Sequence, residues 1–143
     1  MEENFVVLLF LAAWGNDTLA YCTGMLIGKH KMSPILSPKK SIEGLVGGIV
    51  GAAILGALYG LYLNTYIRFS FNPVTMFPIV CGLSGAVSVI GDLAASAIKR
   101  DSGIKDYGTL IPGHGGILDR FDSIIFIAPV IYYLTVMISG GAI

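Results

Sequence analysis

The sequence predicts an all-α membrane protein, a polytopic bundle of about four transmembrane helices joined by charged loops. The chain has 143 residues, of which 55% are hydrophobic and only 13% are charged. Soluble domains carry about 25% charged residues, and a domain of this size needs polar cover for its surface. The mean hydropathy of +0.78 therefore argues against an ordinary soluble globular protein. We interpret residues 1–143 as a single membrane-embedded region.

Four segments are long and apolar enough to cross a bilayer, which takes about 20 residues. They cover residues 5–27, 42–63, 74–98 and 124–138. The fourth is short, so we expect its start to reach back toward Leu118. Glu2 and Glu3 stand where a secretory signal peptide would carry positive charge, so the first segment is not interpreted as one.

The basic residues predict the orientation of these spans. Eight of the nine fall in the two loops that follow the first and third spans, namely Lys29, Lys31, Lys39, Lys40, Lys99, Arg100, Lys105 and Arg120. Only Arg68 lies in the loop between the second and third spans. Because cytoplasmic loops carry the excess of Lys and Arg, these two loops are expected in the cytoplasm and both chain ends on the other side. Nine acidic residues balance the nine basic ones, and no nucleic-acid partner is expected.

The second span is rich in glycine. Gly44–Gly48, Gly47–Gly51 and Gly56–Gly60 are three pairs of small residues at four-residue spacing, which allow helix backbones to approach closely. The pattern fits either a homodimer interface or packing within one chain, and it does not choose between them.

Two spans contain carboxylates, which are rare in membranes and usually functional there. Asp17 lies near the middle of the first span and is expected to line a polar cavity or to bond a neighbouring helix. In the third span, a polar stripe recurs every four residues, at Ser84, Ser88, Asp92 and Ser96. Tight packing would explain the serines but not the aspartate, so Asp92 is the strongest functional candidate.

The first basic loop contains the segment SPKKS, residues 37–41. Pro38 is expected to stiffen a turn, Lys39 and Lys40 supply two adjacent cations, and the hydroxyl of Ser41 is placed to cap the next helix. This is a candidate phosphate-binding corner. The alternative is that the lysines of this loop simply anchor on anionic headgroups, which is our interpretation of Lys29 and Lys31.

The second basic loop, residues 99–122, mixes cations, aspartates and three closely spaced glycines. Asp119 and Asp122 are three residues apart and would share a helix face. Carboxylates beside cations suggest Mg²⁺ with a phosphorylated substrate, because Mg²⁺ is usually held by one or two carboxylates plus substrate phosphates. A charged interfacial loop whose ions pair with each other is the alternative.

This loop carries an extended motif. SAIKRDSGIKDYGTLIPGHGGILDRFD, residues 96–122, resembles the signature of the phosphatidate cytidylyltransferases, or CDP-diacylglycerol synthases. The fixed positions are S-x-hydrophobic-K-R, four residues, K-D, and then P-x-H-G-G-hydrophobic-x-D-R-hydrophobic-D, and all are present without a gap. WGNDTLAYCTGMLIGKHKMSPILSPKKSIEGLVGG, residues 14–48, and Gly91–Asp92 resemble the same family, so the likeness covers nearly the whole chain.

The resemblance implies that CTP and phosphatidate give CDP-diacylglycerol and pyrophosphate at the inner face of the plasma membrane. It implies a catalytic role for Asp92, Asp119, Lys99 and Arg100, and Mg²⁺ held by Asp92, Asp119 and Asp122, with a second cation such as K⁺ nearby. The residues expected to bind substrate are Ser37, Lys39, Lys40, Ser96, Lys105, Asp106, His114 and Arg120.

Family members usually carry further N-terminal hydrophobic segments, so the chain resembles the C-terminal catalytic part and looks truncated relative to them. Two other functions remain open on the residues alone. A CTP-dependent kinase for a polyprenol or phytol would transfer the γ-phosphoryl group and would need to activate a hydroxyl. A transporter would use Asp17 and Asp92 as an ion path without CTP turnover.

Overall fold

The computed structural model describes residues 2–105, 108 and 117–140. Its elements follow in the order α1 (Glu2–Phe10), η1 (a π-helix, Leu11–Gly15), α2 (Asn16–Ile27), β1 (Lys31–Ser33), β2 (Ser37–Ser41), α3 (Ile42–Tyr66), α4 (Pro73–Asp101) and α5 (Ile117–Ile138). The protein is therefore mostly helical, as the sequence predicts.

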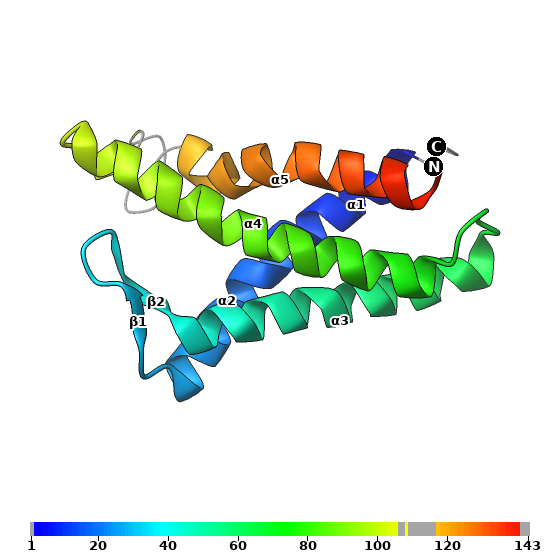
Figure 1. The fold of residues 1–143 in the computed structure, drawn as a ribbon, viewed down its shortest axis with the longest axis horizontal. Coiled ribbons are helices and arrows are strands. Elements are labelled where there is room, and N and C mark those ends of the chain that lie inside the picture. The colour runs from blue at the N-terminus through cyan, green and yellow to red at the C-terminus, as the bar shows by residue number, and fades with distance from the viewer. Residues whose placement is uncertain (1, 106–107, 109–116, 141–143) are drawn as a thin grey trace.

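Four stretches of helix are long and apolar enough to span a membrane, in agreement with the prediction. They are Glu3–Ile27, Ile42–Tyr66, Pro73–Asp101 and Phe121–Ile138. The first combines α1, η1 and α2, and α5 begins where the predicted fourth span was expected to reach back. Figure 1 shows α3, α4 and α5 running along the length of the bundle, while α1 and α2 cross it obliquely.

The ends of α3 and α4 follow from local chemistry. The Ser41 hydroxyl accepts a hydrogen bond from the backbone N–H of Gly44 at 3.1 Å, which confirms the predicted cap. The side chain of Asn72 caps α4 in the same way, and Pro73 occupies its first position, where a missing N–H costs nothing. Beyond α4, Gly103 adopts a left-handed φ of 70°, which suits a residue without Cβ.

The glycines of α3 are used inside the chain. A Cβ atom on Gly48 would lie 2.7 Å from the Ala20 Cβ of α2, and one on Gly60 would lie 2.5 Å from the Pro73 carbonyl of α4. Gly44, Gly47 and Gly51 likewise face α2, and Gly56 faces α4. The interpretation as packing within one subunit is thus confirmed for these glycines, and a homodimer stays a prediction without an assigned surface.

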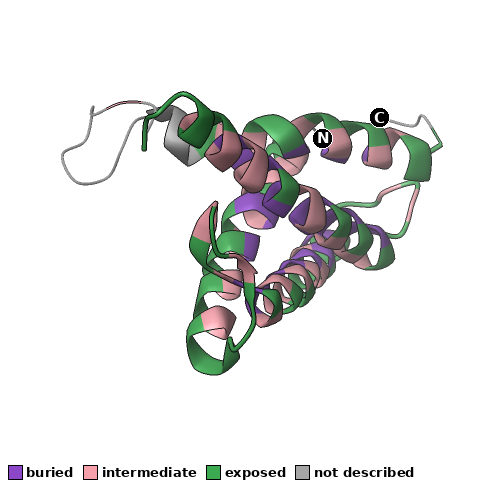
Figure 2. Cartoon of the chain, turned by 60° about the vertical axis from the view of Figure 1, so that its left-hand side comes forward, coloured by how far each residue is buried: buried purple, intermediate pink, exposed green. Residues whose placement is uncertain are grey.

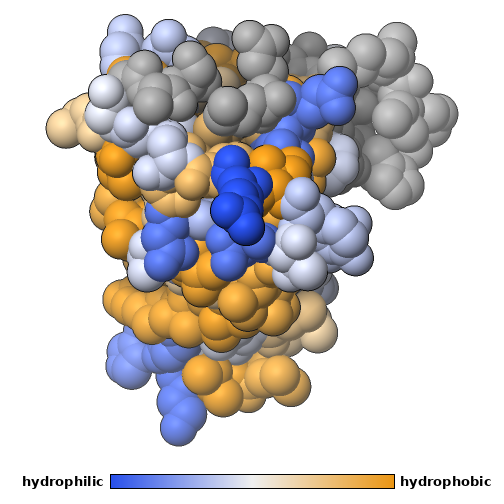
Figure 3. Space-filling model, turned by 90° about the vertical axis from the view of Figure 1, so that its right-hand side faces the viewer, coloured by the Kyte–Doolittle hydropathy of each residue, from blue (hydrophilic) through white to orange (hydrophobic). Residues whose placement is uncertain are grey.

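The core lies where the helices face each other, along the interior shown in purple in Figure 2. It joins α1 and η1 to α3, α4 and α5 through small and large apolar side chains, including Leu8, Ala12, Phe77, Val80 and Ile127. The outer face of α3 is apolar but exposed, with Val46, Val50, Ile54 and Leu58 at four-residue spacing. Apolar surface is also extensive in Figure 3, as expected for helices surrounded by lipid.

One part of the fold departs from the all-α prediction. The first basic loop forms an antiparallel hairpin in which Ser33 pairs with Ser37 and Lys31 with Ser41. Its turn falls between the strands, so the expectation that Pro38 lies in a turn is wrong: Pro38 is the second residue of β2. A backbone hydrogen bond joins the start of the hairpin to the start of α3: the Ile42 N–H donates to the His30 carbonyl at 2.9 Å.

Candidate functional site

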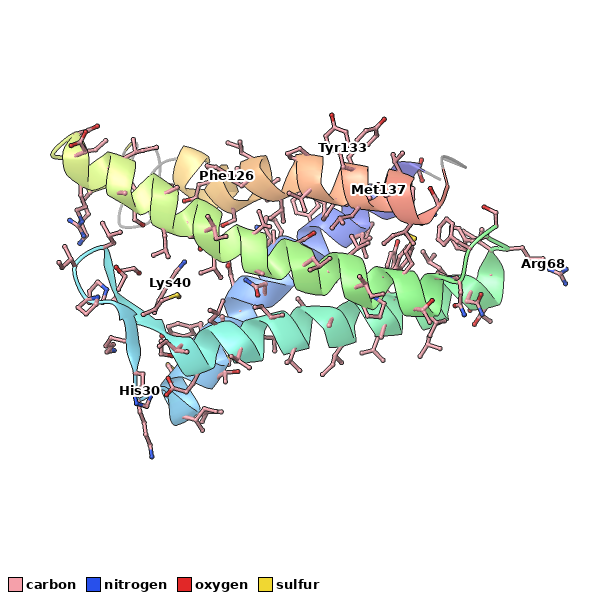
Figure 4. The ribbon with its side chains drawn as sticks, in the orientation of Figure 1. His30, Lys40, Arg68, Phe126, Tyr133 and Met137 are labelled. Carbon is pink, nitrogen blue, oxygen red and sulfur yellow. The ribbon has the colours of Figure 1, made fainter. Side chains whose placement is uncertain are left out.

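A cavity of about 220 Å³, with a mostly apolar wall that carries several charged side chains, lies between α2, the hairpin, the start of α3 and the middle of α4. Its walls bring together residues from the first half and the second half of the chain. They include two carboxylates, two lysines and two serines, namely Asp17, Asp92, Lys39, Lys40, Ser37 and Ser41. Figure 4 shows Lys40 in the space between the hairpin and α4. A cavity with these walls offers both cationic and anionic groups to a ligand.

Asp92 is at the centre of the polar contacts. Its Oδ2 forms an ion pair with the Nζ of Lys40 from β2, and its Oδ1 accepts a hydrogen bond from the hydroxyl of Ser123 in α5. The Asp92 side chain is only 16% exposed, against 32% for Lys40. Side chains from β2 and α5 therefore converge on one carboxylate of α4, and a functional role for Asp92 stays a prediction.

Asp17 supplies a second carboxylate to the cavity. It lies on the first turn of α2 and is close enough to Asp92, Asp122 and Lys40 to interact electrostatically with all three. The prediction that Asp17 lines a cavity is thus confirmed, although most of the cavity wall is apolar. Its approach to Asp92 depends on the close contact of the helices, since Gly48 and Gly85 leave room for the preceding residue, Asn16.

Asp122 is linked to this cluster through its neighbour. The Ser123 N–H donates to Asp122 Oδ1 at 2.7 Å, and the same Ser123 hydroxyl that bonds Asp92 lies 3.3 Å from that oxygen. Lys99, near the end of α4, is within electrostatic range of Asp122. Ser123 was missed in the sequence, where the only signal was its position directly after the DRFD motif.

The structure brings together only part of the predicted site. Ser37, Lys39, Lys40 and Asp92 share the cavity, and Asp122 joins them through Ser123. The other described candidates lie beyond the cavity walls: Ser96 is partly buried one turn after Asp92, and Arg100 and Lys105 are exposed at and after the end of α4. Asp106 and His114, and the side chains of Asp119 and Arg120, lie outside the described part of the structure.

The carboxylates around Asp92 can be compared with the ligands that a magnesium ion needs. Within the described residues, no three His, Cys, Asp or Glu side chains lie close enough to form a complete protein cage for a metal. Mg²⁺ that arrives with a nucleotide needs only one or two carboxylates, because phosphates and water fill the other positions. Asp92, with Asp17 and Asp122 within electrostatic range, fits that requirement.

Behind the cavity is a buried polar patch. The amide atoms of Asn16 and the hydroxyls of Ser84 and Ser88 are buried and make no hydrogen bond with the described residues. Ser84 and Ser88 are the inner part of the predicted polar stripe, whose next member is Asp92. The stripe therefore faces the interior of the bundle, as its four-residue period predicts.

Comparison with known proteins identifies one family to which the chain is similar. The model of the cytidylyltransferase family matches residues 2–138. Curated proteins named phosphatidate cytidylyltransferase are similar: one from Staphylococcus saprophyticus is 38% identical over 135 residues, and one from Staphylococcus aureus strain COL is 41% identical over 133. These alignments cover 94% and 93% of this chain but 50% and 49% of the relatives. The chain thus spans about half the length of the relatives it matches.

Proposed function

Because this chain belongs to the cytidylyltransferase family, we propose that it carries the catalytic region of a phosphatidate cytidylyltransferase. The proposed reaction joins CTP and phosphatidate to give CDP-diacylglycerol and pyrophosphate, as in phospholipid synthesis. The observation that carries the proposal is the convergence of Lys40 and Ser123 on Asp92, which lines a cavity together with Lys40 within a bundle of membrane-spanning length.

The chemistry explains why such a cavity needs both signs of charge. An oxygen of the lipid phosphate attacks the α-phosphorus of CTP, the bond to the β-phosphate oxygen breaks, and pyrophosphate leaves. Two anions must approach each other, so the protein has to offset their repulsion. Phosphate oxygens are already ionised at neutral pH, and no general base is demanded. Catalysis then rests on positioning and electrostatic stabilisation.

The residues divide by proposed role into metal ligands and substrate-binding groups. Asp92, Asp119 and Asp122 are the proposed holders of Mg²⁺, which would neutralise phosphate charge when bound. Ser37, Lys39 and Lys40 close the hairpin side of the cavity, where the nucleotide phosphates would lie. Lys99, Arg100, Lys105 and Arg120 are proposed to grip the remaining phosphate oxygens, with Arg suited to bidentate contacts. We assign Ser96, Asp106 and His114 to substrate binding, His114 as a phosphate contact.

The location of the cavity suits a lipid substrate. The hairpin and the end of α4 lie at one end of the bundle, while the start of α1, the end of α5 and the Arg68 loop lie at the other. The first end carries most of the basic residues, and we propose by the positive-inside rule that it faces the cytoplasm. A phosphatidate headgroup would reach the cavity from the inner leaflet of the plasma membrane, with CTP entering from the cytoplasm.

The test is CTP turnover by the chain in liposomes that contain phosphatidate and Mg²⁺, with pyrophosphate and CDP-lipid both measured. Asp92→Asn is expected to abolish turnover. Asp101→Asn, which neutralises an exposed aspartate at the end of α4 outside the cavity, is the matched control and should retain it. Release of CDP instead of pyrophosphate would indicate a lipid kinase. A folded chain that neither binds nor turns over CTP would contradict the proposal.

A further inference from the structure

Both carboxylate oxygens of Asp92 already have protein partners. Ser123 donates to Oδ1, and the Lys40 ammonium pairs with Oδ2. These two partners differ in kind, since a hydroxyl is neutral and its oxygen can turn toward a cation, whereas an ammonium has three donors and no acceptor. Among the described partners of Asp92, Lys40 is therefore the one that opposes a second cation at this carboxylate.

Electrostatics makes Lys40 and a divalent cation competitors. A carboxylate in a membrane span is costly unless it is paired, and Lys40 meets that need at Asp92. A divalent ion bound at the same carboxylate would place two further positive charges beside the ammonium, in surroundings that screen charge poorly because Asp92 is mostly buried. Binding of the ion at Asp92 is then opposed by Lys40 for as long as the ion pair lasts.

The structure also offers Lys40 an alternative position. Its side chain extends from β2 on a flexible four-carbon stem and is one-third exposed. Ser37 and Lys39 of the same strand line the same cavity, on the side proposed for the nucleotide phosphates. A change of Lys40 rotamer would carry the ammonium away from Asp92 toward an anion bound beside these residues.

We propose that Lys40 is an exchangeable counter-ion of Asp92: it competes with the divalent cation for this carboxylate and moves to the nucleotide phosphates when both ligands bind. The inference rests on the proposed function and adds regulation to that site. Because coupling between two ligands is reciprocal, metal and CTP each strengthen the binding of the other through Lys40. A lysine that only gripped phosphate would leave metal affinity unchanged.

The proposal predicts opposite effects of one substitution on two ligands. Mn²⁺ serves as the metal probe and is titrated by electron paramagnetic resonance without nucleotide. Lys40→Met is expected to tighten Mn²⁺ binding by about 10-fold, equivalent to about 1.4 kcal/mol, and to weaken CTP binding. Lys39→Met, the neighbouring cavity lysine on β2, is the matched control and should leave Mn²⁺ affinity nearly unchanged. Lys40→Arg keeps the charge and should bind Mn²⁺ as the unaltered chain does.

The remaining outcomes are distinguishable. Unchanged or weaker Mn²⁺ binding in Lys40→Met, while Asp92→Asn abolishes it, would overturn the competition and leave the proposed function standing. If Lys40→Met, shown to be folded by circular dichroism, binds no Mn²⁺, the competition is also overturned, because this variant should bind best. Unchanged Mn²⁺ binding in Asp92→Asn would move the metal elsewhere and contradict the proposed site as well. In Asp92→Asn, the further change Lys40→Met should bring no gain.

Discussion

The Ser123 hydroxyl of α5 donates a hydrogen bond to Oδ1 of Asp92 in α4 and thereby ties the fourth span to the carboxylate at the centre of the cavity. The same serine contacts Asp122, so a single side chain aligns two of the three proposed metal ligands. Ser123 is itself nearly inaccessible, at 4% exposure. We regard it as a positioning residue for Asp92.

Removing this hydroxyl should impair the site more than the fold. A hydrogen bond to a charged group contributes about 1.5–3 kcal/mol, so Ser123→Ala is expected to lower CTP turnover by roughly 10-fold or more. Ser139→Ala is the control, because it removes a serine near the end of α5 whose hydroxyl bonds only the Val136 carbonyl among the described contacts. Steady-state kinetics with Mg²⁺ would measure both. Equal losses in the two variants would argue against a positioning role.

The absence of a side chain at Gly48 should allow α2 and α3 to pack closely. A Cβ there would lie 2.8 Å from Asn16 Oδ1 and 2.9 Å from the Asn16 backbone carbonyl oxygen, as well as against Ala20. Gly48→Ala is therefore expected to destabilise the protein by about 1–3 kcal/mol. Thermal unfolding in detergent would measure it.

Gly82→Ala in α4 is the matched comparison. Its Cβ would meet Ala53 at 3.7 Å, an ordinary contact, so the gain in helix propensity of about 0.5–1 kcal/mol should stabilise the protein or leave it unchanged. If Gly82→Ala is as harmful as Gly48→Ala, the close contact between α2 and α3 is not what Gly48 serves.

The two helix caps separate stability from activity. Ser41 caps α3 and lines the cavity, whereas Asn72 caps α4 at the opposite end of the bundle. Ser41→Ala and Asn72→Ala should each cost about 1 kcal/mol of stability. Only Ser41→Ala is expected to raise the KM for CTP, because only this residue borders the proposed nucleotide side. A similar rise in KM for Asn72→Ala would show that the effect comes from stability alone.

The orientation can be tested with single cysteines. Lys31 on β1 and Arg68 between α3 and α4 are both exposed, and β1 and Arg68 lie at opposite ends of the bundle. In a background without Cys22 and Cys81, Lys31→Cys should react with a membrane-impermeant maleimide only after intact cells are lysed, and Arg68→Cys should react before lysis. The reverse pattern would contradict the cytoplasmic placement of the cavity.

The spans were predictable because hydropathy is a local property. Each stretch of helix able to cross a membrane matches a predicted segment within a few residues at most ends, and the hydroxyl of Ser41 caps α3 as its position suggested. The hairpin was not predicted. Its strands are only three and five residues long, and the segment that contains Pro38 gives no alternating apolar pattern to signal β-structure.

The sequence by itself determined that this is a membrane bundle of the cytidylyltransferase family, with Asp92 as its most conspicuous buried charge and its basic residues gathered in two loops. Only the tertiary structure decided that Lys40 meets Asp92 across 52 residues, that Ser123 completes the contact, and that the glycines of α3 pack against α2 and α4. The physical reason is the distance along the chain over which each kind of interaction acts. Hydropathy and helix caps depend on neighbours a few residues away, whereas partners from different helices are fixed by how closely and at what angle those helices cross.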